Sequence, residues 1–184
     1  MLFRSKGDEP PAPYILVATR HGYVLRVPLS SYRSESTKVG RRYVKLEEGD
    51  KVVFVTLIGS EKSMMLASRD GRLIHFAIEE VNILAGVGKG VIGLKIDDGD
   101  EVIGGGLIGE SRFDKLVVEA NNGKQYECGP VAYQPVHRGG RGSEVVKRLD
   151  LVRVIPPPIA LVNWDEIDGK TKPRSEEHTS ELQS

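Results

Sequence analysis

The chain has 184 residues, and its 26 Lys/Arg and 26 Asp/Glu give a formal net charge of zero. With 39% hydrophobic and 28% charged residues, it is typical of a folded globular protein, which excludes wholesale disorder. No apolar run approaches the roughly 20 residues of a membrane helix, and the N-terminus lacks the apolar core of a secretory signal. The single cysteine, Cys128, excludes multi-cysteine metal sites, and we expect a small buried residue in a reducing cytoplasm.

Short β-type runs separated by turn signals dominate the chain. A first unit has apolar or alternating runs followed by His-Gly or Glu-Gly-Asp turns, which favour hairpins. Its four expected strands cover residues 14–19, 23–27, 41–46 and 51–58.

The same order recurs twice. The second unit has expected strands at 63–68, 72–78, 91–96 and 101–108, and the third at 115–120, 124–128, 145–149 and 151–155. The turn glycines Gly22, Gly71 and Gly123 stand 49 and 52 residues apart. Four strands in each unit of about 40–50 residues are typical of propeller blades. We therefore predict an all-β, propeller-like disc with about three four-stranded blades, and at most one helical turn at 79–84.

These units set the expected domain limits. We predict a linker over residues 1–13, blades over 14–158 (units 14–58, 63–108 and 115–158) and a tail over 159–173, which Trp164 would anchor to the disc. The prolines at 156–158 cannot continue a strand ladder, so we interpret them as the end of the propeller-like disc. Residues 174–184, RSEEHTSELQS, resemble a translated sequencing adapter and are excluded from the fold prediction.

Two glycine-rich loops are the candidate functional segments. Residues 88–93 match G-x-G-x-x-G, but strand, turn and strand follow instead of a helix, which disfavours a dinucleotide site. In the third unit, Arg138 and Arg141 alternate with the loop glycines Gly139, Gly140 and Gly142. Such a loop is either a solvated turn or a phosphate-binding surface, where arginines supply forked donors and glycines permit close approach.

The order of hairpin, polar stretch, glycine-rich basic loop, strand, Glu/Asp-Gly-Asp turn and strand resembles the repeat of the C-terminal domain of bacterial gyrase and topoisomerase IV A subunits. The segments that carry the resemblance are 18–32, 38–53, 71–81 and 86–104, within about 14–158. The loop at 138–142 is similar to a basic segment of the family that is called the basic box. That segment begins with glutamine and two basic residues and lies in the first blade. Here Val136 and His137 precede a single Arg138, in the last unit. Gyrase and topoisomerase IV therefore both stay open.

The resemblance implies a β-pinwheel whose basic rim binds, bends and wraps duplex DNA without reading its sequence. We expect phosphate contacts from the third loop first and from the equivalent loops second: Arg138, Arg141, Lys147 and Arg148, then Arg41, Arg42 and Lys89. It also implies that the partner is a topoisomerase B subunit, in an A2B2 holoenzyme, with no membrane association and a cytoplasmic, nucleoid-associated location. ATP and Mg²⁺ would act through other domains and the partner subunit.

Within the chain itself we expect no catalytic centre. No tyrosine stands in the basic, helical setting of the family's strand-breaking residue, and the histidines lack metal-ligand spacing. We interpret Asp97, Asp98 and Asp100 as solvated turn residues instead of a metal cluster. Two alternatives stay open: a protein-interaction propeller without a nucleic-acid role, and an enzyme built on a propeller, for which no constellation of residues is found.

Overall fold

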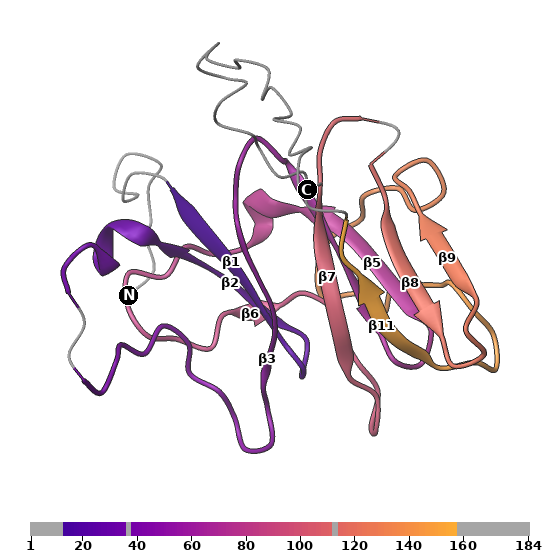
Figure 1. The fold of residues 1–184 in the computed structure, drawn as a ribbon, viewed down its shortest axis with the longest axis horizontal. Helices are drawn as coiled ribbons and strands as arrows, with labels where there is room; N and C mark the ends of the chain where they lie inside the picture. Colours follow the sequence, from indigo (N-terminus) through magenta and orange to yellow (C-terminus); the bar gives the residue numbers. More distant parts are fainter. Residues whose placement is uncertain (1–12, 36–37, 112–113, 158–184) are drawn as a thin grey trace, which may run out of the picture.

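The computed structural model describes residues 13–35, 38–111 and 114–157, which form three antiparallel sheets arranged side by side (Figure 1). The helical turns of this part are two short 3-10 helices, η1 (Leu29–Tyr32) and η2 (Ile78–Glu80). The strands of the first two units are β1 (Tyr14–Thr19), β2 (Tyr23–Pro28), β3 (Val52–Leu57), β4 (Ser63–Ser68), β5 (Arg72–Ala77), β6 (Val91–Ile92) and β7 (Val102–Ile108). Those of the third are β8 (Leu116–Ala120), β9 (Gln125–Cys128), β10 (Ser143–Glu144) and β11 (Leu151–Ile155).

The sheets exchange strands between neighbouring units. The first has the order β3-β1-β2-β6, the second β10-β5-β4-β7, and the third β11-β8-β9. Strand β6 of the second unit therefore completes the first sheet, and β10 of the third unit completes the second. The all-β, propeller-like prediction is confirmed, but the sheets do not follow the unit limits 14–58, 63–108 and 115–158.

The third run of each unit is where the strand predictions fail. The prediction over 41–46 is wrong, because only Val44 forms an isolated parallel bridge, with Gly88. The run at 91–96 shortens to β6, and the run at 145–149 is wrong because the strand lies at β10 instead. The runs of the second and third units pair only where they cross the preceding sheet's edge, and they then turn inward, so that Leu94 and Val146 are buried between sheets.

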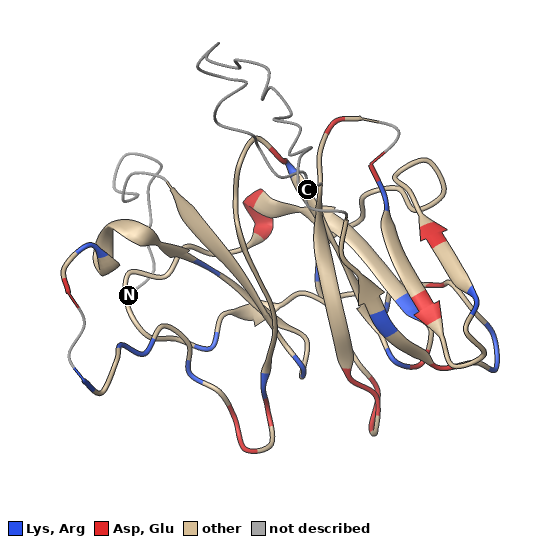
Figure 2. Ribbon diagram, in the orientation of Figure 1, with Lys and Arg blue, Asp and Glu red and all other residues tan. Residues whose placement is uncertain are grey.

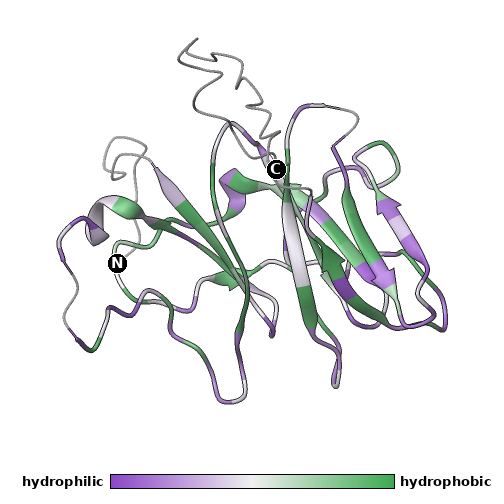
Figure 3. Cartoon of the chain, in the orientation of Figure 1, coloured by the Kyte–Doolittle hydropathy of each residue, from purple (hydrophilic) through white to green (hydrophobic). Residues whose placement is uncertain are grey.

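Two apolar layers hold the sheets together. Leu16 and Ala18 of the first sheet pack with Leu66 and Phe76 of the second. The opposite face of the second sheet, with Met65, packs against the third. Figure 3 shows hydrophobic stretches along β1, β4 and β5, while the loops mix hydrophobic and hydrophilic residues. Because both faces of the second sheet are covered, its strands are apolar on both sides.

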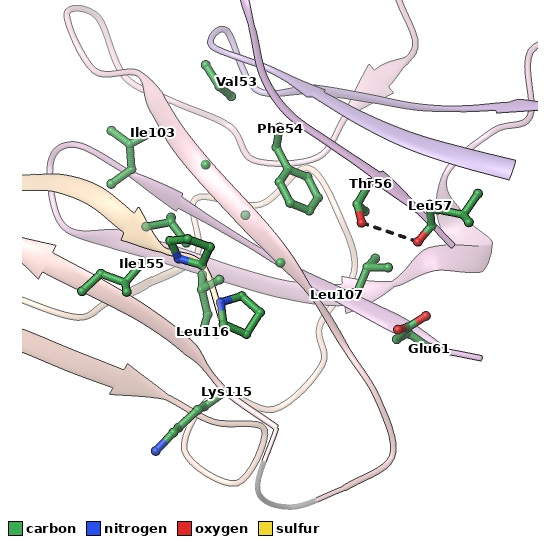
Figure 4. A pocket seen from close by; sticks show the side chains of 16 residues that line it. Val53, Phe54, Thr56, Leu57, Glu61, Ile103, Leu107, Lys115, Leu116 and Ile155 are labelled. Carbon is green, nitrogen blue, oxygen red and sulfur yellow. Dashed lines mark hydrogen bonds between the residues drawn. The ribbon is translucent and has the colours of Figure 1, made fainter. Parts of the chain in front are cut away.

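Strands β3, β7 and β11 form the inner edge of the three sheets, with β7 between the other two. A cavity of about 500 Å³ lies among them, lined mainly by apolar side chains such as Phe54, Leu107 and Ile155 (Figure 4). The glycines at 104–106 line one wall. At Gly105 a Cβ would lie 2.5 Å from the Met65 carbonyl oxygen and 2.8 Å from the Leu66 side chain. Strand β7 therefore packs tightly on β4.

In the first two units, a Gly-Asp turn before the last strand is hydrogen-bonded to the turn of the first hairpin. The Asp50 carboxylate accepts hydrogen bonds from the backbone N–H groups of His21 (2.9 Å) and Lys51 (2.8 Å). Asp100 repeats this arrangement with Asp70 (3.0 Å) and Glu101 (2.7 Å). Both aspartates are only 9% exposed. The interpretation of solvated turn residues is therefore wrong for Asp100, because its carboxylate satisfies donors of two turns.

A buried histidine links the second sheet to the third unit. His75 donates from Nδ1 to the Tyr133 carbonyl at 2.6 Å, and its Nε2 accepts from the Ser63 hydroxyl at 2.8 Å. Burial lowers the pKa of His75 below its ordinary value of 6.5. Cys128 is fully buried as expected, and burial raises the pKa of its thiol to about 11.

We predict that Asp100→Ala lowers the free energy of unfolding by about 2 kcal/mol, because two backbone donors lose a charged acceptor. Urea unfolding measures the change. The matched control is Asp98→Ala, whose exposed side chain should leave the stability within about 0.5 kcal/mol of the parent. Equal losses in the two variants would contradict the role given to Asp100.

We also predict that stability falls as the pH drops below about 6.5, the ordinary pKa of histidine. The lowered pKa means that the unfolded chain binds a proton at a pH where folded His75 stays neutral. Stability is therefore complete above the unfolded pKa and declines below it, by up to about 1.4 kcal/mol per pH unit. Urea unfolding at several pH values should show a shallower slope for His75→Gln. An unchanged slope would assign the pH dependence to other groups.

Candidate nucleic-acid interface

Three segments follow the edge of the sheets opposite the cavity, where β6 and β10 lie. They are residues 38–46, 86–95 and 137–148, and we call them together the outer rim. Each segment carries the glycine-rich or basic stretch of its unit. The topology thus places the loops of three successive units on one edge, away from β3, β7 and β11.

Backbone hydrogen bonds interlock these segments. Lys45 donates to the Gly88 carbonyl at 2.9 Å, and Lys95 repeats the contact one unit later with Gly140, also at 2.9 Å. Gly139 donates to the Gly93 carbonyl at 2.6 Å. Because the backbone of each segment is hydrogen-bonded to the next, the three segments are held in a fixed order along the edge.

The outer rim is strongly basic although the whole chain is neutral. Its segments contain ten Lys/Arg and one acidic residue, Glu144. The basic residues are Lys38, Arg41, Arg42, Lys45, Lys89, Lys95, Arg138, Arg141, Lys147 and Arg148. Seven acidic residues lie in or beside the two neighbouring Gly-Asp turns, at 47–50 and 97–101, which form separate red stretches in Figure 2. All seven basic residues singled out from the sequence lie on this rim.

Arg138 fixes the loop instead of pointing freely into solvent. Its Nε donates to the Glu80 carbonyl at 2.8 Å and its Nη1 to the Ile92 carbonyl at 3.0 Å. Its backbone N–H donates to the Glu80 carboxylate at 3.2 Å. These bonds tie the third loop to η2 and β6, so Arg138 positions Arg141.

Three further predicted residues have partners within the chain, and two of them form ion pairs. Arg141 pairs with Asp97 at 3.1 Å. Lys89 pairs with Glu47 at 2.5 Å, which raises the pKa of the lysine, and lies 4.0 Å above the Tyr23 ring. Pairs with exposed partners exchange readily, because a surface ion pair is worth at most about 1 kcal/mol.

Arg41, the third, is held more firmly. Its guanidinium donates to the Ser31 carbonyl (3.1 Å), the Ser34 hydroxyl (2.7 Å) and the Glu35 carbonyl (2.9 Å). These contacts brace the loop between β2 and the first rim segment. Arg41 is thus shared between holding this loop and presenting charge on the rim.

The remaining rim cations are exposed, and of these only Lys147 has a partner in the part of the chain that the structure describes, a long ion pair with Glu144. Within the described residues, no hydrogen bond or ion pair involves the side chains of Arg42, Lys45, Lys95 and Arg148. Lys147 is 82% exposed and lies 3.9 Å from Glu144. Arg148 has φ 60°, in the left-handed region that non-glycine residues rarely adopt, so the turn holds this cation out at some cost.

The sequence interpretation missed Lys38, Lys45 and Lys95. A signal was available for two of them: Lys45, Lys95 and Lys147 each directly follow a buried apolar residue at the end of the third run. Aligning the units on that residue would have revealed one lysine in each unit at the same place on the rim.

No group of three His, Cys, Asp or Glu residues in the described part of the chain could hold a metal ion. None of the helices there is long and apolar enough to cross a membrane. The tail at 159–173, Trp164 and the adapter-like residues 174–184 lie outside the described residues, as does nearly all of the 1–13 linker.

We predict that Arg138→Ala lowers the free energy of unfolding by about 2 kcal/mol, because two carbonyl groups lose a charged donor. The control is Arg141→Ala, which removes only an exposed ion pair and should cost less than about 1 kcal/mol. Chemical unfolding of both variants makes the comparison. An unchanged free energy of unfolding in Arg138→Ala would show that the loop does not depend on the hydrogen bonds of Arg138.

Comparison with known proteins matches this architecture. The family profile described as "DNA gyrase C-terminal domain, beta-propeller" matches residues 13–58 and 62–107. The DNA gyrase A protein of Helicobacter pylori (strain ATCC 700392 / 26695) is 34% identical over 67% of this chain, which covers 15% of that protein.

Two solved structures share the fold. The C-terminal domain of DNA topoisomerase IV has a TM-score of 0.68 at 24% identity, with 80% of this chain and 47% of that chain covered. The DNA gyrase A C-terminal domain has a TM-score of 0.66 at 20% identity, with 84% and 52% covered. The chain thus spans about half of these domains and a small part of the whole gyrase A protein. The three strand-exchanged sheets are blades of a β-pinwheel, and the chain belongs to the DNA gyrase C-terminal domain family.

Proposed function

We propose that this chain binds duplex DNA along the outer rim and bends it, as part of a type II topoisomerase A subunit. The rim contacts would go to phosphates, so binding would be independent of base sequence. Arg42, Lys45, Lys95, Lys147 and Arg148 would meet phosphates directly. Arg141 and Lys89 would exchange their carboxylate partners for phosphate oxygens, while Arg41 and Arg138 would hold the loops in place and add charge.

The observation that supports this proposal is the charge imbalance of the rim. Ten basic residues and one acidic residue lie on three interlocked segments of a chain whose net charge is zero. Association with a polyanion depends on such a local stripe and not on the total charge. Scattered surface charge would have mixed both signs along these segments.

The arrangement of the stripe favours bending. Successive blades in a disc turn about a common axis, so cations on the outer edge follow a curve. DNA is stiff over its persistence length of about 150 bp, and it follows a curved surface only where contacts repay the deformation. A rim with cations on every blade supplies such contacts repeatedly.

In the whole enzyme, this domain would present a bent DNA segment for strand passage at the bacterial nucleoid. The B subunit would join A subunits in an A2B2 assembly, and ATP and Mg²⁺ would act through those other parts. Gyrase and topoisomerase IV are both among the proteins that this chain is similar to, so the proposal covers either enzyme.

The salt dependence of binding tests the rim. In Arg42→Gln/Lys45→Gln/Lys95→Gln/Arg148→Gln, four cations of the rim are neutralised. The slope of log affinity against log salt should become less steep by about 3–4, at roughly 0.9 for each phosphate interaction removed. Fluorescence anisotropy with a short duplex measures it, and energy transfer between the duplex ends reports bending.

A matched variant controls for total charge. Lys51→Gln/Lys62→Gln/Lys115→Gln/Lys124→Gln removes the same charge from exposed lysines off the rim, and its slope should stay close to that of the parent. Equal effects of the two variants would reject a rim-specific site. An absence of salt-dependent DNA binding in the parent chain would instead favour the protein-interaction propeller.

A further inference from the structure

Two ion pairs of the outer rim stand at equivalent positions of the repeat. Their cations, Lys89 and Arg141, each directly precede a rim glycine with positive φ. Their partners, Glu47 and Asp97, are the first acidic residues of the two Gly-Asp turns. Each pair thus joins the turn of one unit to the basic loop of the next. We call Glu47–Lys89 and Asp97–Arg141 the junction pairs.

The backbone holds both junction pairs in the same way. Lys45 donates from its backbone N–H to the Gly88 carbonyl, and Lys95 donates likewise to the Gly140 carbonyl, both at 2.9 Å. These lysines stand two residues before the carboxylates, and these glycines stand directly before the cations. Because the same backbone bond recurs beside both pairs, the fold itself brings each cation to its carboxylate.

Charge at these positions occurs only where a cation and a carboxylate meet. In the first unit, Val39 stands at the position of the cation and is 96% exposed. In the third unit, Leu149 stands at the position of the carboxylate. The two series therefore carry charge at both junctions and an apolar residue at each of the remaining positions. This correspondence indicates that the carboxylates are placed to meet the rim cations.

Both junction pairs are open to solvent. The side chains of Lys89 and Glu47 are 37% and 50% exposed, and those of Arg141 and Asp97 are 60% and 47% exposed. Lysine and arginine donate to carboxylate and phosphate oxygens with the same charge-assisted hydrogen bonds. The two carboxylates therefore occupy, in the chain alone, the places where phosphate oxygens would bind on the rim.

We infer that Glu47 and Asp97 set the DNA affinity of the outer rim, because they compete with phosphates for the cations of the junction pairs. The inference rests on the proposed DNA binding and identifies two residues that act against it. A duplex that binds at a junction displaces the carboxylate from its cation. The displaced carboxylate then lies beside a polyanion of the same sign, which weakens binding further.

The competition weakens DNA binding without blocking it. A surface ion pair is easily broken, so a phosphate can take the place of the carboxylate. Other rim cations, such as Arg42 and Arg148, have no ion-pair partner within the described residues and meet phosphates unopposed. A duplex held by these cations brings its phosphates up to the junction pairs. The carboxylates thus limit how tightly the rim holds DNA and favour its release.

Removal of the two carboxylates tests the competition. In Glu47→Gln/Asp97→Asn of the full chain, we expect the affinity for a duplex that spans both junctions to rise about fivefold or more at physiological salt. Two surface pairs, each worth a factor of about two to five, no longer have to be broken. Fluorescence anisotropy measures the affinity. The urea midpoint should stay near that of the parent, because the replaced side chains are exposed.

A matched variant controls for the change in net charge. Glu48→Gln/Asp98→Asn removes the same charge from the same two turns, and among the described residues neither side chain has a hydrogen bond or an ion pair. Its affinity should rise by less than about twofold. An equal rise in both variants would overturn the inference, since net charge alone would then explain the gain.

A cycle with the cations shows whether the effect passes through the junction pairs. In the background Lys89→Gln/Arg141→Gln, removing Glu47 and Asp97 should raise the affinity no more than the control does. A gain as large as in the parent background would overturn the competition but leave the proposed DNA binding in place. If neither the parent nor Glu47→Gln/Asp97→Asn binds DNA in a salt-dependent way, the proposed function and this inference are both rejected.

Discussion

The structure depends on the pairing of the third run of the second and third units with the sheet before it. Gly93 donates to the Gly22 carbonyl at 2.8 Å, and Val145 donates to the Gly71 carbonyl at the same distance. The strand just before each contact, β6 or β10, covers what would otherwise be an open sheet edge. Leu94 and Val146 then enter the apolar layers between the sheets. Neighbouring blades are therefore joined by backbone and by core at once.

The pairing of the third runs also determines where the basic and acidic residues lie. The third run carries the basic loop of its unit, and its contact with the preceding edge strand fixes that loop on the outer rim. The acidic residues of the Gly-Asp turns are drawn instead toward backbone donors, as at Asp50 and Asp100. A chain without net charge is thus sorted into a basic edge and acidic turns. The separation is a consequence of the fold and requires no excess of either sign.

The arginines of the rim divide between two tasks. Arg138 and Arg41 use several of their donors on carbonyl and hydroxyl oxygens of the chain, which makes the loops rigid. Arg42 and Arg148 present theirs to solvent within the described part of the chain. A rigid loop lowers the entropy that must be lost when a phosphate is bound. Arg138 and Arg41 would therefore support phosphate binding by Arg42 and Arg148. The same residue type therefore serves structure and the proposed binding, according to its neighbours.

The hairpins and the class of fold follow from local patterns in the sequence. Period-two patterns and Gly turns fix local pairing, and β1, β4 and β11 lie at the limits predicted for them. The sequence also identified the basic loops, since glycine and arginine in alternation are visible without coordinates. The partners of the third runs depend on how the sheets pack, because a two-residue pairing such as β6 with β2 leaves almost no periodic signal in the sequence. The tertiary structure likewise separated Arg138 from Arg42 and buried Asp100, because hydrogen-bond partners about 30 or more positions away in the chain, or their absence, cannot be read from local pattern.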